Sequence, residues 1–299
     1  MIKAGVIGDP ISHSLSPKLH GFLLEKYGIK GSYEAIQVSP ENLEQDFDRL
    51  IKQGFKGFNV TIPHKEKVFE LATKRGYKIS NIARAVKAVN TIYLDENNII
   101  NATNSDVFGF YKNLQTFSDN FSLLKSPKTA IILGAGGAAN AIIYNLISNC
   151  HFEKIYIINR SQEKAENLKN YYYDYFIKSG LAGDSAIPFN KIEITKEITQ
   201  EIGAQASLLV NTTSLGMKNQ PELNLDLSHL NKTAIVYDIV YNPLITNLLK
   251  TAQTRGNPTI TGIGMLIYQA FEGFEKWFGV KPELTQDEFS QLAKILLSK

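Results

Sequence analysis

Short apolar segments alternate with amphipathic ones along most of the chain. Residues 2–7 form an alternating apolar segment that ends at Gly8-Asp9-Pro10, and a helical pattern begins near Pro17, whose fixed φ suits a first helical turn. The same rhythm predicts strands at 33–38, 57–61, 129–133, 154–158, 207–210 and 234–240, and helices at 40–53, 64–75, 107–116 and from about 161. Regular alternation of strands and helices favours an α/β fold with a mainly parallel sheet.

One pair of predicted strands departs from this rhythm. Residues 88–94 and 99–102 are both apolar, and the four residues between them, 95–98, are the turn formers Asp-Glu-Asn-Asn. This pattern favours a β-hairpin. A chain of 299 residues is long enough for two domains of ordinary size. A second α/β unit begins with the strand at 129–133, so we place the end of the first domain near Asp106.

The last two helical stretches, 264–278 and 285–297, close the chain. In the first of them, apolar residues recur at the i, i+3, i+4 spacing that buries one helix face. The residues on that face are Ile267, Ala270, Phe271, Phe274, Trp277 and Phe278. Gln269 falls on another side of the helix, so its side chain can point elsewhere. We expect the final helix to return to the first domain.

Composition narrows the class of protein. The chain is 43% hydrophobic and 20% charged, which is the balance of a globular protein with a core. Its 32 basic and 29 acidic residues are too even for the basic stripe that nucleic acid binding requires. No apolar stretch approaches the roughly 18 residues of a membrane span, and no secretory signal is visible at the start. With Cys150 as the single cysteine, we expect a cytoplasmic protein without a disulfide or a metal site.

The segment that follows the strand at 129–133 matches a dinucleotide-binding turn. Gly134, Gly136 and Ala139 have the G-x-G-x-x-A spacing, and a helical pattern follows. In such turns the first glycine permits the tight bend, the second lets the backbone approach a pyrophosphate, and the helix N-terminus holds the anion. The alternative is a glycine turn that serves packing alone.

The residues after the next strand bear on the choice of cofactor. An NAD site usually places an acidic residue about twenty residues beyond the glycine turn, against the ribose 2′-hydroxyl. This chain has Asn159-Arg160-Ser161 there, with Lys164 one turn later. A guanidinium is suited to a 2′-phosphate, whereas an acid would repel it, so we expect NADP. The alternative is a surface arginine at a strand end.

Polar residues follow strands of the first domain. The loop 8–17 contains three serines and opens a helix, which could hold a carboxylate, although Ser16 could instead cap that helix. Thr61 and Lys65 follow the strand at 57–61, at the sheet edge where open α/β folds bind ligands. Lys65 could equally be a solvated lysine, and Asp106 could be the cap of the next helix.

In their order along the chain, these segments resemble shikimate dehydrogenases, which interconvert 3-dehydroshikimate and shikimate with NADP(H). The resemblance runs nearly from end to end. It is carried by Ser14–Pro17, Asn59–Lys65, Ala88–Thr91, Asn104–Asp106 with Gly109, the turn at Gly134, Asn159-Arg160, Asn211–Met217, Tyr241–Pro243 with Thr246, and Gly262 with Met265, Leu266 and Gln269.

The resemblance implies a role for each matching residue. Lys65 and Asp106 would be the catalytic pair, and Ser14 and Ser16 would hold the substrate carboxylate. The rest of the ring would be surrounded by Thr61, Lys65, Asn90, Asp106, Tyr241 and Gln269. The cofactor residues would be Gly134, Ala135, Gly136, Gly137 and Ala138 at the pyrophosphate, Asn159, Arg160, Ser161 and Lys164 at the adenosine 2′-phosphate end, and Ile239 and Gly262 at the nicotinamide.

The resemblance also implies the domain plan. A substrate-binding catalytic domain would comprise residues 1–106 and be completed by the C-terminal helices at 266–299, with a Rossmann NADP-binding domain at 107–265 between them. The partners would be the small-molecule substrate and NADP, without nucleic acid or membrane, and the protein would be a monomer or a homodimer.

The chain departs from the family pattern at two positions. Lys87 stands where the family usually has glycine, and Gly21 stands where asparagine is common, which puts local loop shape in question. Residues 171–202 match no family motif. Three roles for Lys65 stay open: the base itself, a group that shares one proton with Asp106, or a group that positions the substrate hydroxyl. Two other functions also stay open, an NAD-dependent quinate/shikimate dehydrogenase and a catalytically idle sensor.

Overall fold

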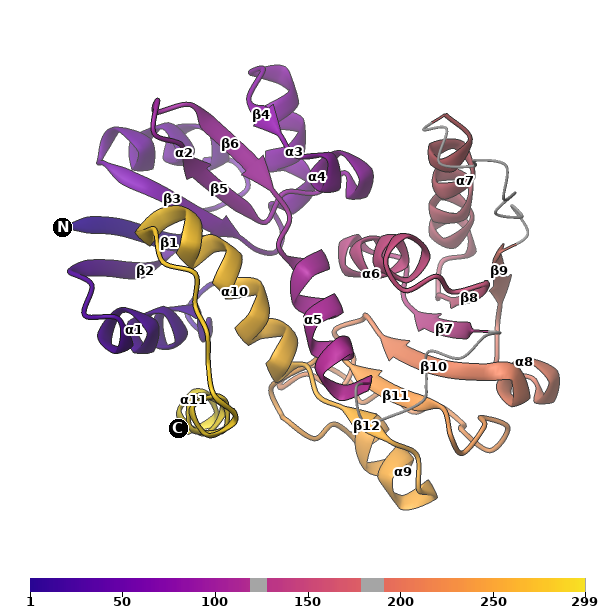
Figure 1. The fold of residues 1–299 in the computed structure, drawn as a ribbon. Helices are drawn as coiled ribbons and strands as arrows, with labels where there is room; N and C mark the ends of the chain where they lie inside the picture. The colour runs from indigo at the N-terminus through magenta and orange to yellow at the C-terminus, as the bar shows by residue number, and fades with distance from the viewer. Residues whose placement is uncertain (119–127, 179–190, 299) are drawn as a thin grey trace. The chain divides into compact units, whose positions relative to one another are not determined.

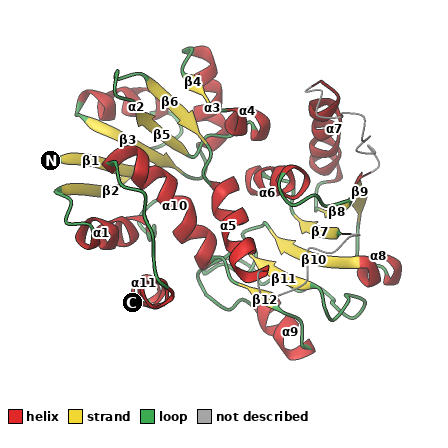
Figure 2. Ribbon diagram, in the orientation of Figure 1, coloured by secondary structure: helices red, strands yellow, loops and turns green. Residues whose placement is uncertain are grey.

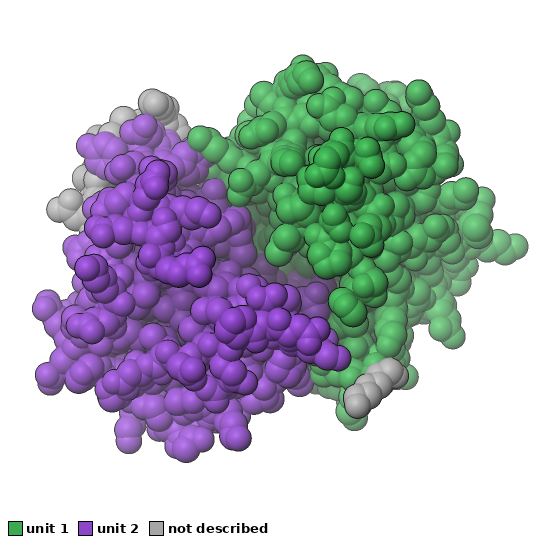
Figure 3. All heavy atoms as spheres, turned by 180° about the vertical axis from the view of Figure 1, so that it is seen from behind, with its two compact units in different colours: residues 1–109, 267–299 green, residues 110–266 purple. Residues whose placement is uncertain are grey.

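A computed structural model describes residues 1–118, 128–178 and 191–298. The chain divides into two compact units, and Figure 3 colours them separately. Unit 1 comprises residues 1–109 and 267–299, and unit 2 comprises residues 110–266. The chain leaves unit 1 within helix α5 (Asp106–Ser118) and returns within helix α10 (Ile263–Phe278). Unit 1 is therefore discontinuous in the sequence.

Unit 1 is built on a mixed six-stranded sheet (Figure 1). The order is β2 (Gly31–Gln37), β1 (Ile2–Gly8), β3 (Phe55–Val60), β5 (Thr91–Leu94), β6 (Ile100–Thr103) and β4 (Lys78–Ile79). Strand β1 runs parallel to β2 and β3, whereas β5 runs antiparallel to β3 and β6. The β5–β6 hairpin confirms the predicted one, and Asp95 closes its turn by accepting the N–H groups of Asn97 and Ile99.

The helices of the first 109 residues are α1 (Ser16–Lys26), α2 (Leu43–Lys52), α3 (Lys65–Lys74), α4 (Asn81–Val86) and the start of α5. A core of buried side chains joins α2 and α3 to the sheet, with Phe47, Val68 and Leu71 against Phe58 and Ile92. The apolar burial of these positions is the main stabilising term of the unit.

Helix α10 completes unit 1 from the other end of the chain. All six residues of its predicted apolar face are buried. Trp277 Nε1 donates to the carbonyl of Ile92 at 2.8 Å, close to Gly57. Gly57 has φ +155, and a Cβ there would lie 2.0 Å from the Ile92 oxygen, so the docking requires glycine. Helix α11 (Gln286–Leu297) follows and begins with a capping box of Thr285 and Glu288.

Unit 2 is built on a second sheet, in which every pairing is parallel. The order is β12 (Thr259–Ile260), β11 (Ile235–Asp238), β10 (Ala206–Asn211), β7 (Thr129–Leu133), β8 (Lys154–Ile158) and β9 (Ile192–Thr195). Numbered within the unit, this order is 6-5-4-1-2-3, the doubly wound arrangement of dinucleotide-binding sheets.

Helices cover both faces of this second sheet (Figure 2). Ala130 and Ile132 of β7 belong to one core cluster with α6 (Gly137–Ser148) and α7 (Gln162–Lys178), while Ile131 and Leu133 belong to another cluster with α9 (Asn247–Arg255). Successive side chains of β7 thus point to opposite faces of the sheet, as the pleat of a strand requires. The predicted α/β class with a Rossmann-type unit is confirmed.

Two details of the fold bear on the departures from the family pattern. Gly21 lies inside α1 and is exposed, so it does not shape a loop. Lys87 ends α4 in the left-handed region with φ +48, the conformation that favours glycine, and this accounts for the residue that the family usually has there. Within the part of the chain that the structure describes, no helix is long and apolar enough to span a bilayer.

Candidate active site

Lys65 and Asp106 meet at one edge of the unit 1 sheet. Because β5 runs antiparallel to both β3 and β6, those two strands run in the same direction and end at the same edge. Lys65 begins α3 after β3, and Asp106 begins α5 after β6. Lys65 Nζ lies 2.6 Å from Asp106 Oδ2, with 25% and 13% of the two side chains exposed. A short, partly buried ion pair can hold and exchange a proton with a bound ligand.

Asn90 fixes the other oxygen of Asp106. Its Nδ2 donates to Asp106 Oδ1 at 2.8 Å, and its Oδ1 accepts the backbone N–H of Ser105 at 2.7 Å. The N–H of Asp106 itself is accepted by the side chain of Asn104 at 3.0 Å. Asp106 therefore lies in the first turn of α5 with its carboxylate engaged by Lys65 and Asn90, and the capping alternative for this residue is wrong.

The two serines lie where the loop after β1 enters α1. Leu15 is the N-cap residue of α1, Ser14 Oγ accepts the N–H of Ser16 at 3.3 Å, and Ser16 is the first helical residue. The capping alternative for Ser16 is thus also wrong. Tyr33, on β2, donates its hydroxyl to Asn59 Oδ1 at 2.6 Å.

The remaining predicted substrate residues lie in both units. Thr61 directly follows β3 and is partly exposed, and Gln269 of α10 is 8% exposed, with its Oε1 3.3 Å from Ser105 Oγ. Both belong to unit 1. Tyr241 belongs to unit 2, where burial raises the pKa of its phenol. The structure thus brings Gln269 to the hydrogen-bonded group around Asp106, although 164 residues separate it from Ser105.

The glycine turn of unit 2 has two glycines with different surroundings. Gly134 has φ +110, and a Cβ there would lie 2.7 Å from Thr212 Oγ1. Gly136, the N-cap residue of α6, has no atom of the described residues within 4 Å of such a Cβ. The first glycine is needed by the fold, and the second leaves open space at a helix N-terminus. Since Thr212 follows β10, the turn lies at the β7–β10 switch point, where ligands bind in such sheets.

The segment expected to contact the adenosine end follows β8. Asn159 Nδ2 donates to the carbonyl of Ser161 at 2.7 Å, and Ser161 Oγ accepts the N–H of Lys164 at 3.3 Å. Arg160 and Lys164 are exposed, and neither forms an ion pair with any residue in the described ranges. Both positive charges are therefore available to an anionic ligand.

A buried carboxylate, which the sequence analysis missed, lies directly before Ile239, one of the two residues expected at the nicotinamide. Asp238 ends β11 and accepts hydrogen bonds from Asn211 Nδ2 at 2.9 Å, the N–H of Val240 at 3.0 Å and Thr246 Oγ1 at 2.6 Å. Burial raises the pKa of this carboxyl, while the three donors act in the opposite direction. The sequence feature that could have identified Asp238 is an acidic residue at the end of an apolar strand.

The loop that contains Gly262 packs closely on this strand end. A Cβ at Gly262 would lie 2.1 Å from the carbonyl oxygen of Ile239, which follows Asp238. The two residues expected at the nicotinamide are thus in direct backbone contact.

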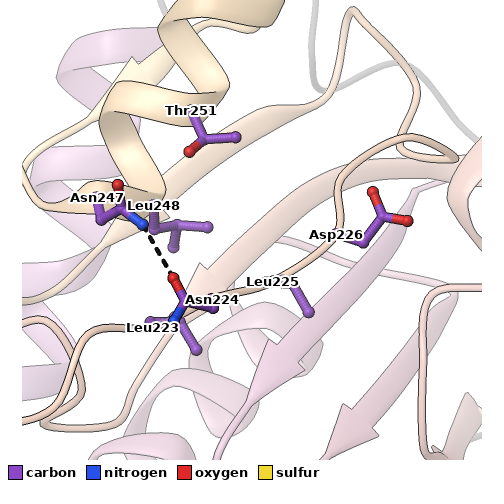
Figure 4. Close-up of a pocket in the computed structure, with 7 residues that line it drawn as sticks. All are labelled: Leu223, Asn224, Leu225, Asp226, Asn247, Leu248 and Thr251. Atoms are coloured by element: carbon purple, nitrogen blue, oxygen red, sulfur yellow. Dashed lines mark hydrogen bonds between the residues drawn. The ribbon is translucent and has the colours of Figure 1, made fainter.

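Figure 4 shows a pocket elsewhere on unit 2, of about 310 Å³. It lies between the segment 223–226 and the start of α9, with Asn247 Nδ2 donating to Asn224 Oδ1 at 3.3 Å. None of the predicted site residues lines it. The pocket therefore does not change the assignment of the site.

The fold and these groups define a class of protein. A doubly wound parallel sheet with a glycine turn at its switch point is a dinucleotide-binding module, and here it is joined to a unit that contains a lysine–aspartate pair at a strand edge. This is the plan of a two-unit nucleotide-dependent oxidoreductase.

Comparisons with known proteins identify the family. The shikimate dehydrogenase substrate binding domain matches residues 6–92, the shikimate/quinate 5-dehydrogenase domain matches 117–181, and the shikimate 5′-dehydrogenase C-terminal domain matches 262–286. The chain is 40% identical over 295 residues to the shikimate dehydrogenase (NADP(+)) of Paramagnetospirillum magneticum, covering 99% of this chain and 98% of that one. The chain therefore belongs to the shikimate dehydrogenase family.

Solved structures have the same fold. Shikimate 5-dehydrogenase from Thermus thermophilus, in complex with NADP(H) and shikimate, aligns with a TM-score of 0.80 at 29% identity, covering 99% of this chain and 100% of that one. Quinate dehydrogenase from Corynebacterium glutamicum, in complex with NAD, aligns with a TM-score of 0.81 at 27% identity, covering 99% and 98%. These two solved structures share one fold and hold different cofactors, NADP(H) and NAD.

Proposed function

We propose that this chain is an NADP-dependent shikimate dehydrogenase, which reversibly reduces 3-dehydroshikimate to shikimate in the shikimate pathway of aromatic amino acid biosynthesis. The observation that carries the proposal is the 2.6 Å pair of Lys65 and Asp106, held by Asn90 within the unit that matches the substrate binding domain. We also expect the enzyme to act in the cytoplasm, as a monomer or a homodimer.

Unit 1 would bind the ring. Ser14 and Ser16, at the entrance to α1, would donate hydroxyl hydrogen bonds to the carboxylate. Thr61, Asn90 and Gln269 would contact the ring hydroxyls. Several fixed donors and acceptors at known positions orient a small polar ring, which is a large part of catalysis in such reactions.

Lys65 and Asp106 would handle the proton. In the direction of reduction the ketone oxygen gains negative charge, and the Lys65 ammonium can stabilise that charge and donate the proton that completes the new hydroxyl. Asp106 keeps the ammonium in place through the Nζ–Oδ2 contact of 2.6 Å. In the direction of oxidation the same pair accepts the hydroxyl proton.

Unit 2 would bind NADP(H), which supplies or accepts the hydride. The backbone from Gly134 to Ala138 would face the pyrophosphate, and Asn159, Arg160, Ser161 and Lys164 would hold the 2′-phosphate. Ile239 and Gly262 would contact the nicotinamide. Two features support this assignment: the open space at Gly136, and the positive charges of Arg160 and Lys164, which have no acidic partner among the described residues.

The test is the absorbance at 340 nm of the purified protein with each combination of shikimate or quinate and NADP⁺ or NAD⁺. We expect the highest kcat/KM with shikimate and NADP⁺. A preference for quinate and NAD⁺ would favour the quinate dehydrogenase alternative. Binding of shikimate and NADP⁺ without NADPH formation would favour the sensor.

A further inference from the structure

Two buried hydroxyl groups join the predicted substrate residues of unit 1. Thr91 begins β5 and Ser105 precedes α5, and both residues are 0% exposed. Their hydroxyl oxygens lie 3.2 Å apart. Neither residue has a role in the proposed function, and a hydroxyl without access to water must find its partners inside the protein.

The backbone fixes the orientation of the Asn90 amide. An asparagine side chain has an acceptor and a donor end that are usually assigned from their neighbours. Here the backbone N–H of Ser105, which can only donate, lies 2.7 Å from Asn90 Oδ1. The Nδ2 group must therefore face Asp106, where it donates to Oδ1 at 2.8 Å.

The backbone also fixes the direction of the Thr91 hydroxyl. Asn59 Nδ2 donates to the carbonyl of Asn90, which can only accept, and the same nitrogen lies 3.1 Å from Thr91 Oγ1. Tyr33 donates to the opposite end of that amide. Thr91 therefore accepts from Asn59 and gives its own proton to Asn90 Oδ1, 2.9 Å away.

The Ser105 hydroxyl links this group to Gln269. Ser105 Oγ lies 3.2 Å from Asn90 Oδ1, 3.2 Å from Thr91 Oγ1 and 3.3 Å from Gln269 Oε1. Asn90 Oδ1 already accepts from the Ser105 N–H and from Thr91, and an amide oxygen has two lone pairs. Thr91 and Gln269 are therefore the partners left for the Ser105 proton, and Gln269 Oε1 is the one that belongs to a predicted substrate residue.

We infer that Thr91 and Ser105 are positioning residues for the reaction, which together preset the amides of Asn90 and Gln269 and, through Asn90, the carboxylate of Asp106. The inference rests on the proposed function, because it assigns these amides to the substrate ring. Its physical basis is preorganisation: groups that are already oriented need not reorganise when the substrate binds.

Thr91 offers a pair of variants that separates positioning from packing. Thr91→Val keeps the shape and removes the hydroxyl, whereas Thr91→Ser keeps the hydroxyl and removes a methyl group. We expect Thr91→Val to lower kcat with shikimate by about tenfold, the scale of one lost buried hydrogen bond with an unsatisfied partner. We expect Thr91→Ser to stay within about threefold of wild type, and the KM for NADP⁺ to be unchanged in both.

Thr103 supplies the matched control. It lies opposite Thr91 in the β5–β6 pair, and its hydroxyl bonds to Ser80 Oγ at 2.9 Å, outside the chain of bonds that leads to Asp106. Thr103→Val should leave kcat and the KM for shikimate within about twofold of wild type, with thermal unfolding of each variant measured alongside.

A second variant tests the other end of the chain of bonds. Ser105→Ala should raise the KM for shikimate by roughly tenfold, because Gln269 Oε1 loses the Ser105 hydroxyl as a donor. The inference is overturned if Thr91→Ser loses as much activity as Thr91→Val, or if Ser105→Ala leaves the KM for shikimate unchanged. A wild-type chain without shikimate-dependent NADPH formation would instead overturn the proposed function, and this inference with it.

Discussion

The two units prepare for a ligand by opposite means. In unit 1 the predicted site residues Lys65, Asp106 and Asn90 are joined by hydrogen bonds, which continue through Ser105 to Gln269. In unit 2 the predicted cofactor residues are largely backbone at a helix N-terminus and exposed positive side chains.

This difference predicts which substitutions each unit tolerates. In unit 1, catalysis should depend on the chemical identity of polar side chains, since each donor has a specific acceptor. In unit 2, binding should depend on the absence of a Cβ at the turn and on net charge at the adenosine end.

The largest effect is expected at the glycine turn. Gly134→Ala should lower the free energy of unfolding by about 3 kcal/mol, since alanine is strained at φ +110 and its Cβ would meet Thr212. Gly136→Ala has open space for its Cβ and should change stability by less than about 1 kcal/mol, while raising the KM for NADP⁺ by at least roughly tenfold. Urea unfolding and steady-state kinetics measure the two effects. Equal stability of both variants would contradict the assignment of the first glycine to the fold.

Arg160 should determine the preference for NADP. Arg160→Gln removes a charge-assisted contact with the 2′-phosphate and should raise the KM for NADP⁺ by about thirtyfold. The KM for NAD⁺, which has no 2′-phosphate, should change by less than about threefold. Lys169→Gln, on the helix that follows Arg160 and outside the predicted site, is the control. An equal effect of Arg160→Gln on both cofactors would remove Arg160 from the specificity site.

The buried histidine of unit 1 should make stability depend on pH. His20 is 0% exposed and lies 3.8 Å from the Tyr33 ring in a stacked arrangement, and burial lowers its pKa from 6.5 to about 3. The unfolded chain therefore binds a proton below pH 6.5 that the folded chain does not bind until about pH 3, so stability falls as the pH falls through that window. At pH 5 the loss attributable to His20 is about 2 kcal/mol.

His20→Phe should flatten this dependence, whereas the same change at the exposed His229 should not. Unfolding in urea at several pH values between neutral and mildly acidic measures both. Below pH 6.5 the wild-type protein should lose more free energy of unfolding than His20→Phe does. Equal losses in the two proteins would contradict this prediction.

The smallest effect is expected at Lys87. Because this residue has φ +48, Lys87→Gly should raise the free energy of unfolding by about 1 kcal/mol, whereas Lys87→Ala should not. Denaturant titration resolves a difference of this size. A loss of stability in the glycine variant would show that interactions of the lysine side chain outweigh the backbone strain.

Much of the fold could be predicted from periodicity. Strands β7 and β8 have the predicted bounds, because short, fully apolar runs flanked by polar residues are typical of buried parallel strands. The two-residue strands β4 and β12 were missed, since two residues carry no periodicity. Helix α9, which begins at the Thr246 cap, was missed because it is short and its apolar residues are few.

The site could be predicted only in part. The sheet-edge rule and the family resemblance indicated Lys65 and Asp106, which are 41 residues apart and in contact. The hydrogen bonds of Thr91 and Ser105 could not be predicted, because they depend on side-chain directions across two strands and a helix. The two capping alternatives stayed open for the same reason: sequence spacing identifies a helix start, and it does not tell which partner a polar side chain finds there.

The central claim is that the Lys65–Asp106 pair transfers the proton that accompanies the hydride. The most direct measurement is kcat for shikimate oxidation by Lys65→Met, compared with Lys67→Met, an exposed lysine on the same helix. We predict a loss of about 10²-fold or more in the first variant, the scale of a positioned proton-transfer group, and less than about twofold in the second. Near-normal turnover by a folded Lys65→Met enzyme would contradict the claim.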